Sequence, residues 1–359
     1  MALLNRKVKV VVDDKIPYIR EAICRLSDDV VFAPGSAIDP DLVADADALI
    51  IRTRTRCDRH LLAGSRVQFI ATATIGFDHI DTAFCQANGI HWTNAPGCNA
   101  ASVAQYLHSV LLLLLTDFGR PASELKLGVV GVGHVGSKVA ELGRRLGFRV
   151  LLNDPPRQRR EPELGFQPLQ VLARECDILT LHVPLSREAD PTYHLADDRF
   201  FAMLGRRPAI VNTSRGEVMD TDALLRAMDA GRVGRVVVDV WENEPHPSPD
   251  LLRRAFIATP HIAGYSADGK ANATRMSLEA MARHFGLKAD FSIVPPPPIN
   301  PIITANSMAD AILQIYDPRH DCMALRANPT LFEQLRGNYP LRREAEAYDI
   351  RIRAGGSKA

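Results

Sequence analysis

The stretch KLGVVGVGHVG, residues 126–136, decides the fold of this chain. Its first part, KLGVVGVG (126–133), is a short apolar run rich in valine, which is typical of a buried strand. Its second part places Gly131, Gly133 and Gly136 in the spacing G-x-G-x-x-G. The first glycine permits a tight turn, the second lets the backbone approach a pyrophosphate, and the third allows close helix–strand packing. The stretch therefore predicts a strand, a phosphate-binding turn and the start of a helix.

An acidic residue completes this pattern. The next strand-like segment, FRVLLND, ends at Asp154, near the distance of ~20 residues at which an acid meets the adenosine ribose hydroxyls. The alternative role for Asp154 is a cap at the end of the strand. A carboxylate here repels a 2′-phosphate, which favours NAD over NADP, whereas the nearby Arg157, Arg159 and Arg160 favour the reverse. We expect NAD to lie against the helix N-terminus and to contact Gly131, Gly133, His134, Val135, Gly136 and Asp154.

Strand-like and helical segments alternate along most of the chain. Helical patterns cover residues 17–26, 134–146 and 221–230, and strand-like runs cover residues 7–13, 48–53, 67–73, 126–133, 148–154, 177–184, 208–214, 235–241 and 255–261. Such alternation is typical of parallel sheets covered by helices, and continuous apolar strands indicate burial on both faces. We predict an α/β protein with two doubly wound parallel-sheet domains: a Rossmann NAD domain and a flavodoxin-like substrate domain.

Two segments mark the domain boundaries. Ala100 to Phe118 reads as a buried helix linking the domains, and VPPPPI (294–299) as a stiff break. We assign residues 1–99, completed by a helix at 267–286, to the substrate domain, residues 100–266 to the NAD-binding domain and residues 290–359 to a small C-terminal dimerisation region. This last region carries four apolar residues that must pack against another surface: Ile312, Leu313, Ile315 and Tyr316. We favour an oligomer interface over a tail that folds back on its own chain.

Composition limits the class of partner. The formal net charge of the 359 residues is +1, so no global field draws the protein to nucleic acid or an anionic membrane. The six cysteines form no C-x-x-C pair, which argues against a zinc site or a disulfide framework and for a reducing compartment. MALLNRKVKV lacks a signal-peptide core, and the apolar run Val110–Leu115 is far shorter than the ~20 residues that cross a bilayer. We expect a cytoplasmic enzyme with a small-molecule substrate.

Three segments that follow strands carry candidate catalytic residues: NTSRGEVMD (212–220), DVWENEP (239–245) and TPHIAGY (259–265). Ligands of open α/β sheets bind beyond the carboxyl ends of strands, so Arg215, Glu244 and His261 are expected at one edge. A guanidinium holds a carboxylate with two parallel hydrogen bonds, an imidazole accepts a hydroxyl proton, and a neighbouring carboxylate fixes its tautomer. The set suits oxidation of a 2-hydroxy acid. The alternative roles are a surface cation for Arg215, a solvated loop acid for Glu244 and a polar turn residue for His261.

A basic strand end, RTRTR (52–56), suits a phosphorylated substrate. With a two-residue period, the three arginines point to one side and Thr53 and Thr55 to the other, unless the strand ends first. We expect Arg52 or Arg56 to help hold the phosphate; the alternative is a solvated strand end. DHID (78–81) reads as a helix start capped by Asp78, and no metal is expected because no matching ligand pair accompanies it.

The order of these segments after the glycine turn and the acid resembles the D-isomer-specific 2-hydroxyacid dehydrogenases over residues 7 to 285. Within that family, the chain is most similar to the branch that oxidises 4-phospho-D-erythronate in pyridoxal 5′-phosphate biosynthesis. The segments that carry this closer resemblance are DDKIPY (13–18), DADALIIRT (45–53), ATATIGFDHID (71–81), NAPGCNA (94–100), HIAGYSADGKA (261–271) and LRGNYPLRRE (335–344).

The resemblance implies roles for named residues. It implies that His261 is the proton donor and acceptor, with Arg215 and Glu244 in the active site. It implies substrate contacts from Thr53, Thr74 and Tyr265. It further implies contacts to NAD from Asp154, the backbone of Val183, Thr213, Ser214, Arg215, Asp239 and Gly264.

Three functions follow from these observations. The first is NAD-dependent oxidation of 4-phospho-D-erythronate at C2 to its 2-oxo acid by a homodimer. The second keeps the family but changes the substrate, to D-3-phosphoglycerate or another D-2-hydroxy acid. The third is a non-catalytic, NAD-sensing protein similar to a corepressor, and the joint presence of Arg215, Glu244 and His261 argues against it.

Overall fold

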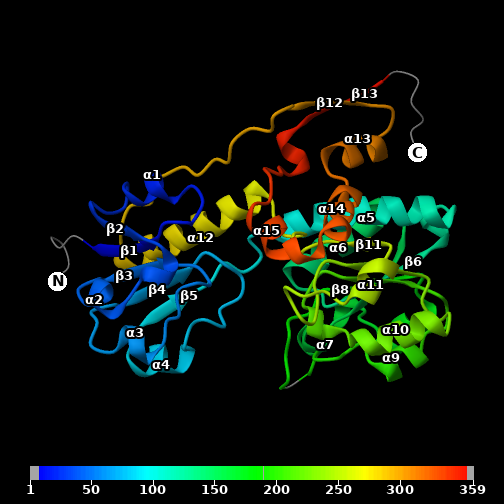
Figure 1. Ribbon diagram of the computed structural model, residues 1–359, viewed down its shortest axis with the longest axis horizontal. Helices are drawn as coiled ribbons and strands as arrows, with labels where there is room; N and C mark the ends of the chain where they lie inside the picture. Colours follow the sequence, from blue (N-terminus) through cyan, green and yellow to red (C-terminus); the bar gives the residue numbers. More distant parts are fainter. Residues whose placement is uncertain (1–7, 189, 354–359) are drawn as a thin grey trace. The chain divides into compact units, whose positions relative to one another are not determined.

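The computed structural model describes residues 8–188 and 190–353 (Figure 1). The chain divides into two compact units. Unit 1 contains the chain up to residue 99 together with residues 266–297, and unit 2 contains residues 100–265 together with the chain from residue 298. Each unit has a parallel sheet, as the alternation of strand-like and helical segments predicted.

The sheet of unit 1 has five parallel strands in the order β2-β1-β3-β4-β5, which is the flavodoxin-like order 2-1-3-4-5. Its strands are β1 (Lys9–Asp13), β2 (Asp29–Ala33), β3 (Ala48–Ile51), β4 (Phe69–Thr72) and β5 (His91–Thr93). Its helices are α1 (Ile19–Ile23), α2 (Pro40–Val43), α3 (Arg59–Leu62), α4 (Thr82–Ala87) and α12 (Ala267–Phe285). The prediction missed β2 and β5, the two edge strands, and neither of them is fully buried.

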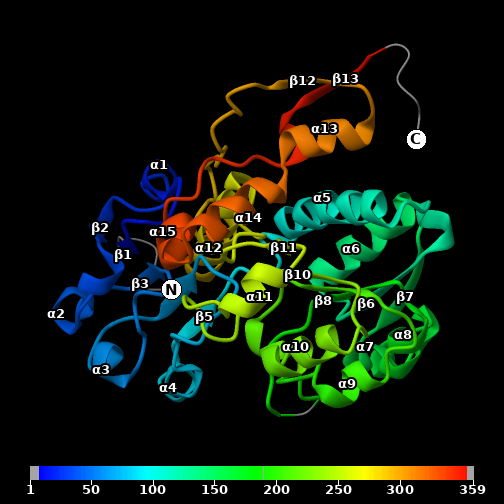
Figure 2. The same cartoon turned by 45° about the vertical axis from the view of Figure 1, so that its right-hand side comes forward.

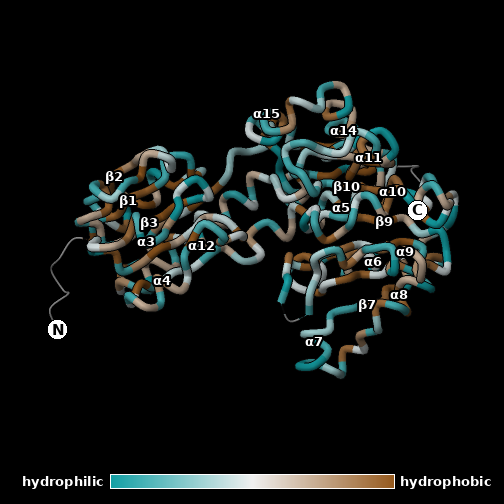
Figure 3. Tube along the Cα trace, turned by 60° about the horizontal axis from the view of Figure 1, so that its bottom comes forward, coloured by the Kyte–Doolittle hydropathy of each residue, from teal (hydrophilic) through white to brown (hydrophobic). Residues whose placement is uncertain are grey.

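Both faces of this sheet are covered. Val10 and Val12 of β1 pack with α1 and α12, whereas Val11 joins a cluster with the residues of α2, α3 and α4. Successive residues of a strand point to opposite faces, so a strand buried on both faces must be apolar throughout. The hydrophobic colour along β1 in Figure 3 follows this rule.

Unit 2 contains a six-stranded parallel sheet in the order β11-β10-β9-β8-β6-β7. Its strands are β6 (Lys126–Val130), β7 (Arg149–Asn153), β8 (Ile178–Leu181), β9 (Ala209–Asn212), β10 (Arg235–Val238) and β11 (Ile257–Ala258). Its helices are α5 (Ala100–Phe118), α6 (His134–Arg145), α7 (Pro155–Arg160), α8 (Leu169–Glu175), α9 (Asp198–Ala202), α10 (Thr221–Asp229) and α11 (Pro249–Arg254). The chain leaves β6 for β7 on one side and returns to β8 on the other. The strand order therefore reverses between β6 and β8, where ligands of such sheets bind.

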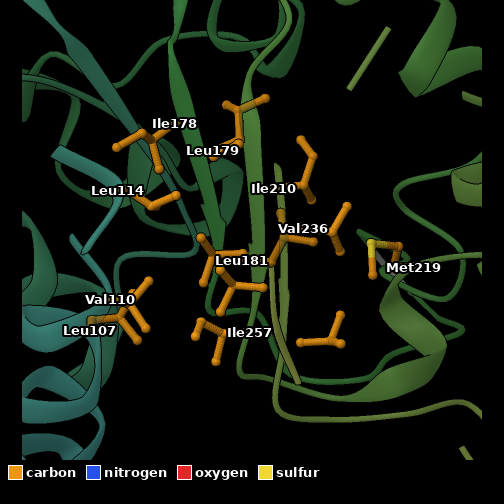
Figure 4. Close-up of a cluster of buried hydrophobic side chains, with 14 of the residues drawn as sticks. Leu107, Val110, Leu114, Ile178, Leu179, Leu181, Ile210, Met219, Val236 and Ile257 are labelled. Carbon is orange, nitrogen blue, oxygen red and sulfur yellow. The ribbon is translucent and has the colours of Figure 1, made fainter. Parts of the chain in front are cut away.

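Helices cover both faces of this sheet. Figure 2 shows α5 and α6 on one face and α8, α9 and α10 on the other. In Figure 4, Leu107, Val110 and Leu114 of α5 lie along the strands that carry Leu181 and Ile257. By length and composition, α5 is apolar enough to cross a membrane. The shortness of the apolar run Val110–Leu115 within it therefore does not exclude a membrane span. Its burial in the core of unit 2 is what identifies it as a core helix.

The C-terminal segment folds back onto unit 2. It contains β12 (Ile302–Ala305), α13 (Met308–Ile315), α14 (Pro318–Ala327), α15 (Phe332–Gly337) and β13 (Asp349–Ile352), and β12 pairs in parallel with β13. Polar residues on one stripe of α5 receive it: Ser102 Oγ donates to Glu344 Oε1 at 2.9 Å, Gln105 Nε2 to the Arg343 carbonyl at 3.0 Å and Ser109 Oγ to the Tyr316 carbonyl at 2.6 Å.

The apolar positions that favoured an interface pack within the chain. Ile312 and Tyr316 are 5% and 7% exposed, and Leu313 and Ile315 pack against the core of unit 2. The folded-back tail thus accounts for all four residues. They are not by themselves evidence of a second subunit.

Candidate active site

The glycine turn between β6 and α6 has the geometry that its spacing predicted. Gly131 has φ +83°, and a Cβ there would lie 2.6 Å from the His182 carbonyl oxygen. A Cβ on Gly136 would lie 1.9 Å from the Gly131 carbonyl oxygen, so only glycine allows this helix–turn contact. A Cβ on Gly133 would meet nothing within 4 Å. The space beside Gly133 is where a pyrophosphate fits, and NAD therefore suits this turn.

The start of α6 and the end of β7 border the turn. His134 is exposed and Val135 half-buried in the first turn of α6, whose N-terminal N–H groups favour an anion. Asp154 caps α7 by accepting from Arg157 N at 2.9 Å, and its other oxygen accepts from Val132 N at 2.8 Å. The cap alternative is therefore realised, and the same carboxylate ties the glycine turn to α7. Because a carboxylate has about four acceptor sites, these bonds leave capacity for ribose hydroxyls.

Two of the three nearby arginines have acidic partners. Arg157 binds Glu161 and donates from Nη1 to the Val132 carbonyl at 2.6 Å, and Arg159 binds Asp190. Arg160 is exposed. Pairing neutralises much of the positive charge that would otherwise attract a 2′-phosphate.

The ends of β8 and β9 carry the next set of predicted residues. Val183 follows β8 by two residues and its side chain lies beside Gly131. Thr213, Ser214 and Arg215 follow β9 directly. Between them, burial lowers the pKa of His182 to about 3, and its ring contacts Thr180 Oγ1 at 2.9 Å. His182 is therefore neutral and positions the strand ends.

Asn212 shapes the turn that presents Arg215, a function that the sequence pattern did not indicate. Its Nδ2 donates to the Arg215 carbonyl at 2.9 Å, and its Oδ1 accepts from Ser214 N at 3.0 Å and from Ser214 Oγ at 2.8 Å. The Arg215 side chain is exposed, with Nη1 donating to the Ser214 carbonyl at 2.8 Å. A fixed backbone with an exposed guanidinium suits recognition of an anion.

The turn after β9 packs on the turn after β10. A Cβ on Gly216 would lie 2.0 Å from the carbonyl carbon of Trp241 and 2.4 Å from Glu242 N. This close approach brings the Arg215 turn against the segment that carries Glu244. The two predicted segments therefore meet at the same edge of the sheet.

Glu244 and His261 form a hydrogen-bonded pair. His261 Nδ1 lies 2.8 Å from Glu244 Oε2 and 3.0 Å from Oε1, and Trp241 N donates to Oε1 at 3.1 Å. Burial disfavours ionisation of Glu244, but its bonds to His261 and Trp241 and the charge of Arg336 hold the pKa of the carboxyl below its usual range. An ionised carboxylate only accepts hydrogen bonds. The hydrogen therefore lies on Nδ1, and Nε2 is the nitrogen that can accept a proton.

The backbone of His261 is in the left-handed region, with φ 55°. Asp239 holds it there: its carbonyl accepts from His261 N at 2.7 Å, and its carboxylate accepts from Ile262 N at 2.8 Å and Ala263 N at 2.9 Å. Burial raises the pKa of Asp239. The resemblance assigned Asp239 a contact to NAD; in the structure this carboxylate is 1% exposed and organises the histidine turn.

Gly264 and Tyr265 end this turn, and both are half-buried. The Tyr265 hydroxyl accepts from Arg336 Nε at 3.0 Å, and Arg336 Nη1 lies 3.8 Å from Glu244 Oε2. Arg336 was not among the predicted site residues, although it lies in the LRGNYPLRRE segment. Nothing in the sequence indicated that α15 folds back to this turn.

In unit 1, the candidate substrate residues follow the neighbouring strands β3 and β4. Arg52 is half-buried, with Nη1 donating to the Lys15 carbonyl at 3.1 Å, whereas Thr53 is exposed. The strand ends before RTRTR, which is the stated exception to the alternation: β3 ends at Ile51, and Thr55 N donates to the Arg52 carbonyl. Thr55 is buried, and Arg56 pairs with Asp58.

Thr74 lies after β4, where its hydroxyl contacts Thr72 Oγ1 at 2.6 Å and donates to the Gly76 carbonyl at 2.8 Å. The expected cap at Asp78 is wrong, since Asp81 caps α4. Within residues 8–188 and 190–353, no group of three or more His, Cys, Asp or Glu side chains could hold a metal ion.

Two stretches of the chain match known family models. Residues 115–263 match the D-isomer specific 2-hydroxyacid dehydrogenase NAD binding domain, and residues 296–358 match a domain of unknown function, DUF3410. The chain is 59% identical over 346 residues to an erythronate-4-phosphate dehydrogenase of Bacteroides fragilis (strain YCH46), covering 96% of this chain and 99% of that protein. It is 42% identical over 371 residues to the protein of that name from Marinobacter nauticus, covering 98% and 96% respectively.

Solved structures show the same fold at low identity. The D-lactate dehydrogenase from Aquifex aeolicus, complexed with NAD and lactic acid, is 24% identical with a TM-score of 0.60, covering 79% of this chain and 100% of that one. The 3-phosphoglycerate dehydrogenase of Entamoeba histolytica is 24% identical with a TM-score of 0.62, covering 80% and 99%. These structures show the fold, and the sequence relatives with the matched NAD binding domain show that the chain belongs to the D-isomer specific 2-hydroxyacid dehydrogenase family.

Proposed function

We propose that this protein oxidises 4-phospho-D-erythronate at C2 with NAD, giving (R)-3-hydroxy-2-oxo-4-phosphooxybutanoate in pyridoxal 5′-phosphate biosynthesis. The observation that carries the proposal is the His261–Glu244 pair, with ring and carboxylate 2.8 Å apart, in the same unit as a glycine turn suited to NAD. The relatives named erythronate-4-phosphate dehydrogenase support the choice of substrate, because the likeness covers 96% of the chain at 59% identity.

The chemistry follows from the side chains. His261 Nε2 takes the C2 hydroxyl proton, and Glu244, which accepts a hydrogen bond from Nδ1–H, stabilises the imidazolium that forms. Arg215 binds the substrate carboxylate with its exposed guanidinium. NAD, when bound, supplies the hydride acceptor. We propose that Gly131, Gly133, Gly136, Asp154, Val183 and Thr213–Arg215 hold the cofactor, and that Arg52, Thr53, Thr74 and Tyr265 hold the substrate.

The phosphate of the substrate requires cations and hydroxyl donors. Arg52 and Thr53 provide one of each at the end of β3, and Thr53 has no hydrogen-bond partner for its hydroxyl among the residues that the structure describes. Arg56 is a weaker candidate, since it already pairs with Asp58 at 3.1 Å. We therefore favour Arg52 over Arg56 as the phosphate ligand.

A spectrophotometric assay tests the proposal. Purified protein and NAD are mixed with 4-phospho-D-erythronate, D-3-phosphoglycerate and unphosphorylated D-2-hydroxy acids, and NADH is followed at 340 nm. We expect the highest kcat/KM with 4-phospho-D-erythronate. A preference for D-3-phosphoglycerate would replace the proposed substrate, and NAD binding without turnover of any hydroxy acid or 2-oxo acid would favour a sensing protein.

We further propose that the protein is a cytoplasmic homodimer. The apolar residues Ile302, Met308 and Ile352 of the C-terminal segment are 49%, 51% and 41% exposed, which suits an interface. The irregular spacing of the six cysteines, with no C-x-x-C pair, supports a reducing compartment. Light scattering coupled to size-exclusion chromatography tests the dimer: a single species of monomer mass at micromolar concentration would contradict it.

A further inference from the structure

We propose that Arg336 of the C-terminal segment is a positioning residue for the reaction: it orients Tyr265 and sets the charge around the His261–Glu244 pair. The inference rests on the proposed function, because the roles of Tyr265, His261 and Glu244 belong to that reaction. It assigns to the DUF3410 segment, residues 296–358, a part in building the active site of its own chain.

The position of Arg336 is the first observation. It lies in α15, and its side chain is 28% exposed. Nε donates to the Tyr265 hydroxyl at 3.0 Å, and Nη1 lies 3.8 Å from Glu244 Oε2 and 3.7 Å from Glu333 Oε1. One guanidinium therefore contacts a candidate substrate residue and the carboxylate partner of the candidate base.

The second observation is that the C-terminal segment is firmly anchored to the turn that carries His261. Fully buried Phe332 joins the core of unit 2 at the start of α15. Arg342 Nη2 donates to the Ala263 carbonyl at 2.6 Å, within the turn itself. Ala258 N donates to Cys322 Sγ at 3.3 Å, at the end of β11. These contacts lie on both sides of His261, so α15 is held in a defined place beside it.

The contact with Tyr265 has a chemical consequence. Because Nε–H donates to the phenol oxygen, the hydroxyl hydrogen points away from the guanidinium. A hydroxyl that accepts from a cation is also a stronger donor, since hydrogen bonds in a chain polarise one another. Arg336 thus prepares Tyr265 to donate to an anionic substrate oxygen.

The contact with Glu244 affects proton transfer. The charged and titratable groups that face the pair and its turn are Arg336 with its partner Glu333, the buried Asp239 beneath the turn, Tyr265, and the buried Arg342 that donates to the Ala263 carbonyl. Arg336 is the cation that forms an ion pair with Glu244, whereas Arg342 reaches the turn through the Ala263 carbonyl, and a cation near the pair opposes addition of a proton. The charge of Arg336 therefore favours the form of the pair in which Glu244 is ionised and Nε2 carries no proton.

Lysine cannot reproduce both contacts. The guanidinium is a planar fork that reaches Tyr265 through Nε and Glu244 through Nη1, whereas an ammonium is a single point charge. Arg336→Lys keeps the charge but loses the fork, and Arg336→Gln loses both. The two variants separate the electrostatic effect on the pair from the orientation of Tyr265.

The experiment compares Arg336→Gln and Arg336→Lys with a matched control, Arg326→Gln. Arg326 also anchors the C-terminal segment, donating from Nε to the Leu252 carbonyl at 3.1 Å, but it contacts none of the site residues. The readouts are kcat and KM for 4-phospho-D-erythronate, the pH profile of kcat/KM and the thermal midpoint. We expect Arg336→Gln to lower kcat/KM about tenfold and to move the acid limb upward by about half a pH unit.

Arg336→Lys is expected to keep the acid limb of the wild type and to raise KM, and Arg326→Gln to lower the thermal midpoint alone. An Arg336→Gln protein with the wild-type acid limb and only a lower thermal midpoint would overturn the proposal, since Arg336 would then act like Arg326.

A second measurement does not depend on turnover. In protein labelled with ¹⁵N-histidine, the ring signals of His261 are identified by their loss in His261→Ala and titrated by NMR. We expect the titration midpoint in Arg336→Gln to lie above that of the wild type; equal midpoints would refute the electrostatic role. If the wild type fails to oxidise 4-phospho-D-erythronate, the proposed function fails, and this titration still decides the role of Arg336.

Discussion

Among the residues that the structure describes, unit 2 contains two histidine–glutamate pairs of nearly equal geometry, and only one of them leaves a ring nitrogen without a partner. His261 and Glu244 are 2.8 Å apart with side chains 25% and 21% exposed; His194 and Glu242 are 2.7 Å apart with side chains 28% and 20% exposed. Both histidines have positive φ, 55° and 49°. Distance, burial and backbone conformation therefore do not distinguish the two pairs.

The second ring nitrogen distinguishes them. His194 contacts Glu242 through Nε2 and lies 3.7 Å from Asp220 through Nδ1, so both nitrogens face carboxylates. The other oxygen of Glu242 accepts from Thr221 N at 2.8 Å, at the start of α10. His261 uses Nδ1 alone, and its Nε2 has no hydrogen-bond partner among the residues that the structure describes. A proton acceptor needs one oriented nitrogen and one available nitrogen, and only His261 meets both conditions.

Alanine at each histidine is the strongest test of this comparison. His261→Ala should lower kcat by ~10²–10⁴ because the proton acceptor is lost, with little change in the affinity for NAD. His194→Ala should leave kcat within a few-fold of the wild type and lower the free energy of unfolding by about 1 kcal/mol. Steady-state kinetics and chemical denaturation measure both. Equal losses of kcat in the two variants would contradict the comparison.

Glutamine at each glutamate is a milder test. Glu244→Gln keeps the shape but no longer stabilises the imidazolium, and it should lower kcat by about 10–100-fold. Glu242→Gln should lower the thermal midpoint through the start of α10 and leave kcat nearly unchanged. The assay is NADH production at saturating substrate. If Glu242→Gln had a lower kcat than Glu244→Gln, the catalytic pair would have to be reassigned to His194 and Glu242.

A glycine variant separates cofactor binding from proton transfer. A methyl group on Gly133 meets no protein atom within 4 Å, so Gly133→Ala should fold normally yet weaken NAD binding about tenfold by occupying the pyrophosphate space. At saturating NAD its kcat should approach that of the wild type, unlike that of His261→Ala. Isothermal titration with NAD and a thermal melt measure the two effects. Unchanged affinity would place the pyrophosphate elsewhere.

The smallest expected effect concerns stability and pH. The folded-state pKa of Glu244 is lowered, so its ionised form stabilises the native state above its unfolded pKa, and this contribution is lost as pH falls through the folded value. The wild type should exceed Glu244→Gln by about 1 kcal/mol in free energy of unfolding at pH 7. The difference should shrink below about pH 4.5. Urea titrations between pH 3 and pH 7 measure it, and a pH-independent difference would show that Glu244 is not a charged partner.

The sequence by itself determined the parts of this protein that depend on local pattern. Runs of β-branched residues located the central strands of both sheets, and the helices at Ala100–Phe118 and Ala267–Phe285 followed from length and periodicity. The glycine turn was predicted from the spacing of Gly131, Gly133 and Gly136, where a side chain would clash or would occupy the space of a ligand. The segments carrying Arg215, Glu244 and His261 followed from the rule that ligands bind beyond strand ends.

Only the tertiary structure decided which side chains meet. The sequence offers a His–Glu pair at 261 and 244 and another at 194 and 242, and the difference lies in what surrounds the second nitrogen. It also gave no sign that Arg336 returns to Tyr265, 71 residues away along the chain. Short edge strands and long-range polar contacts leave no periodic pattern, because they depend on how distant segments pack rather than on the order of neighbouring residues.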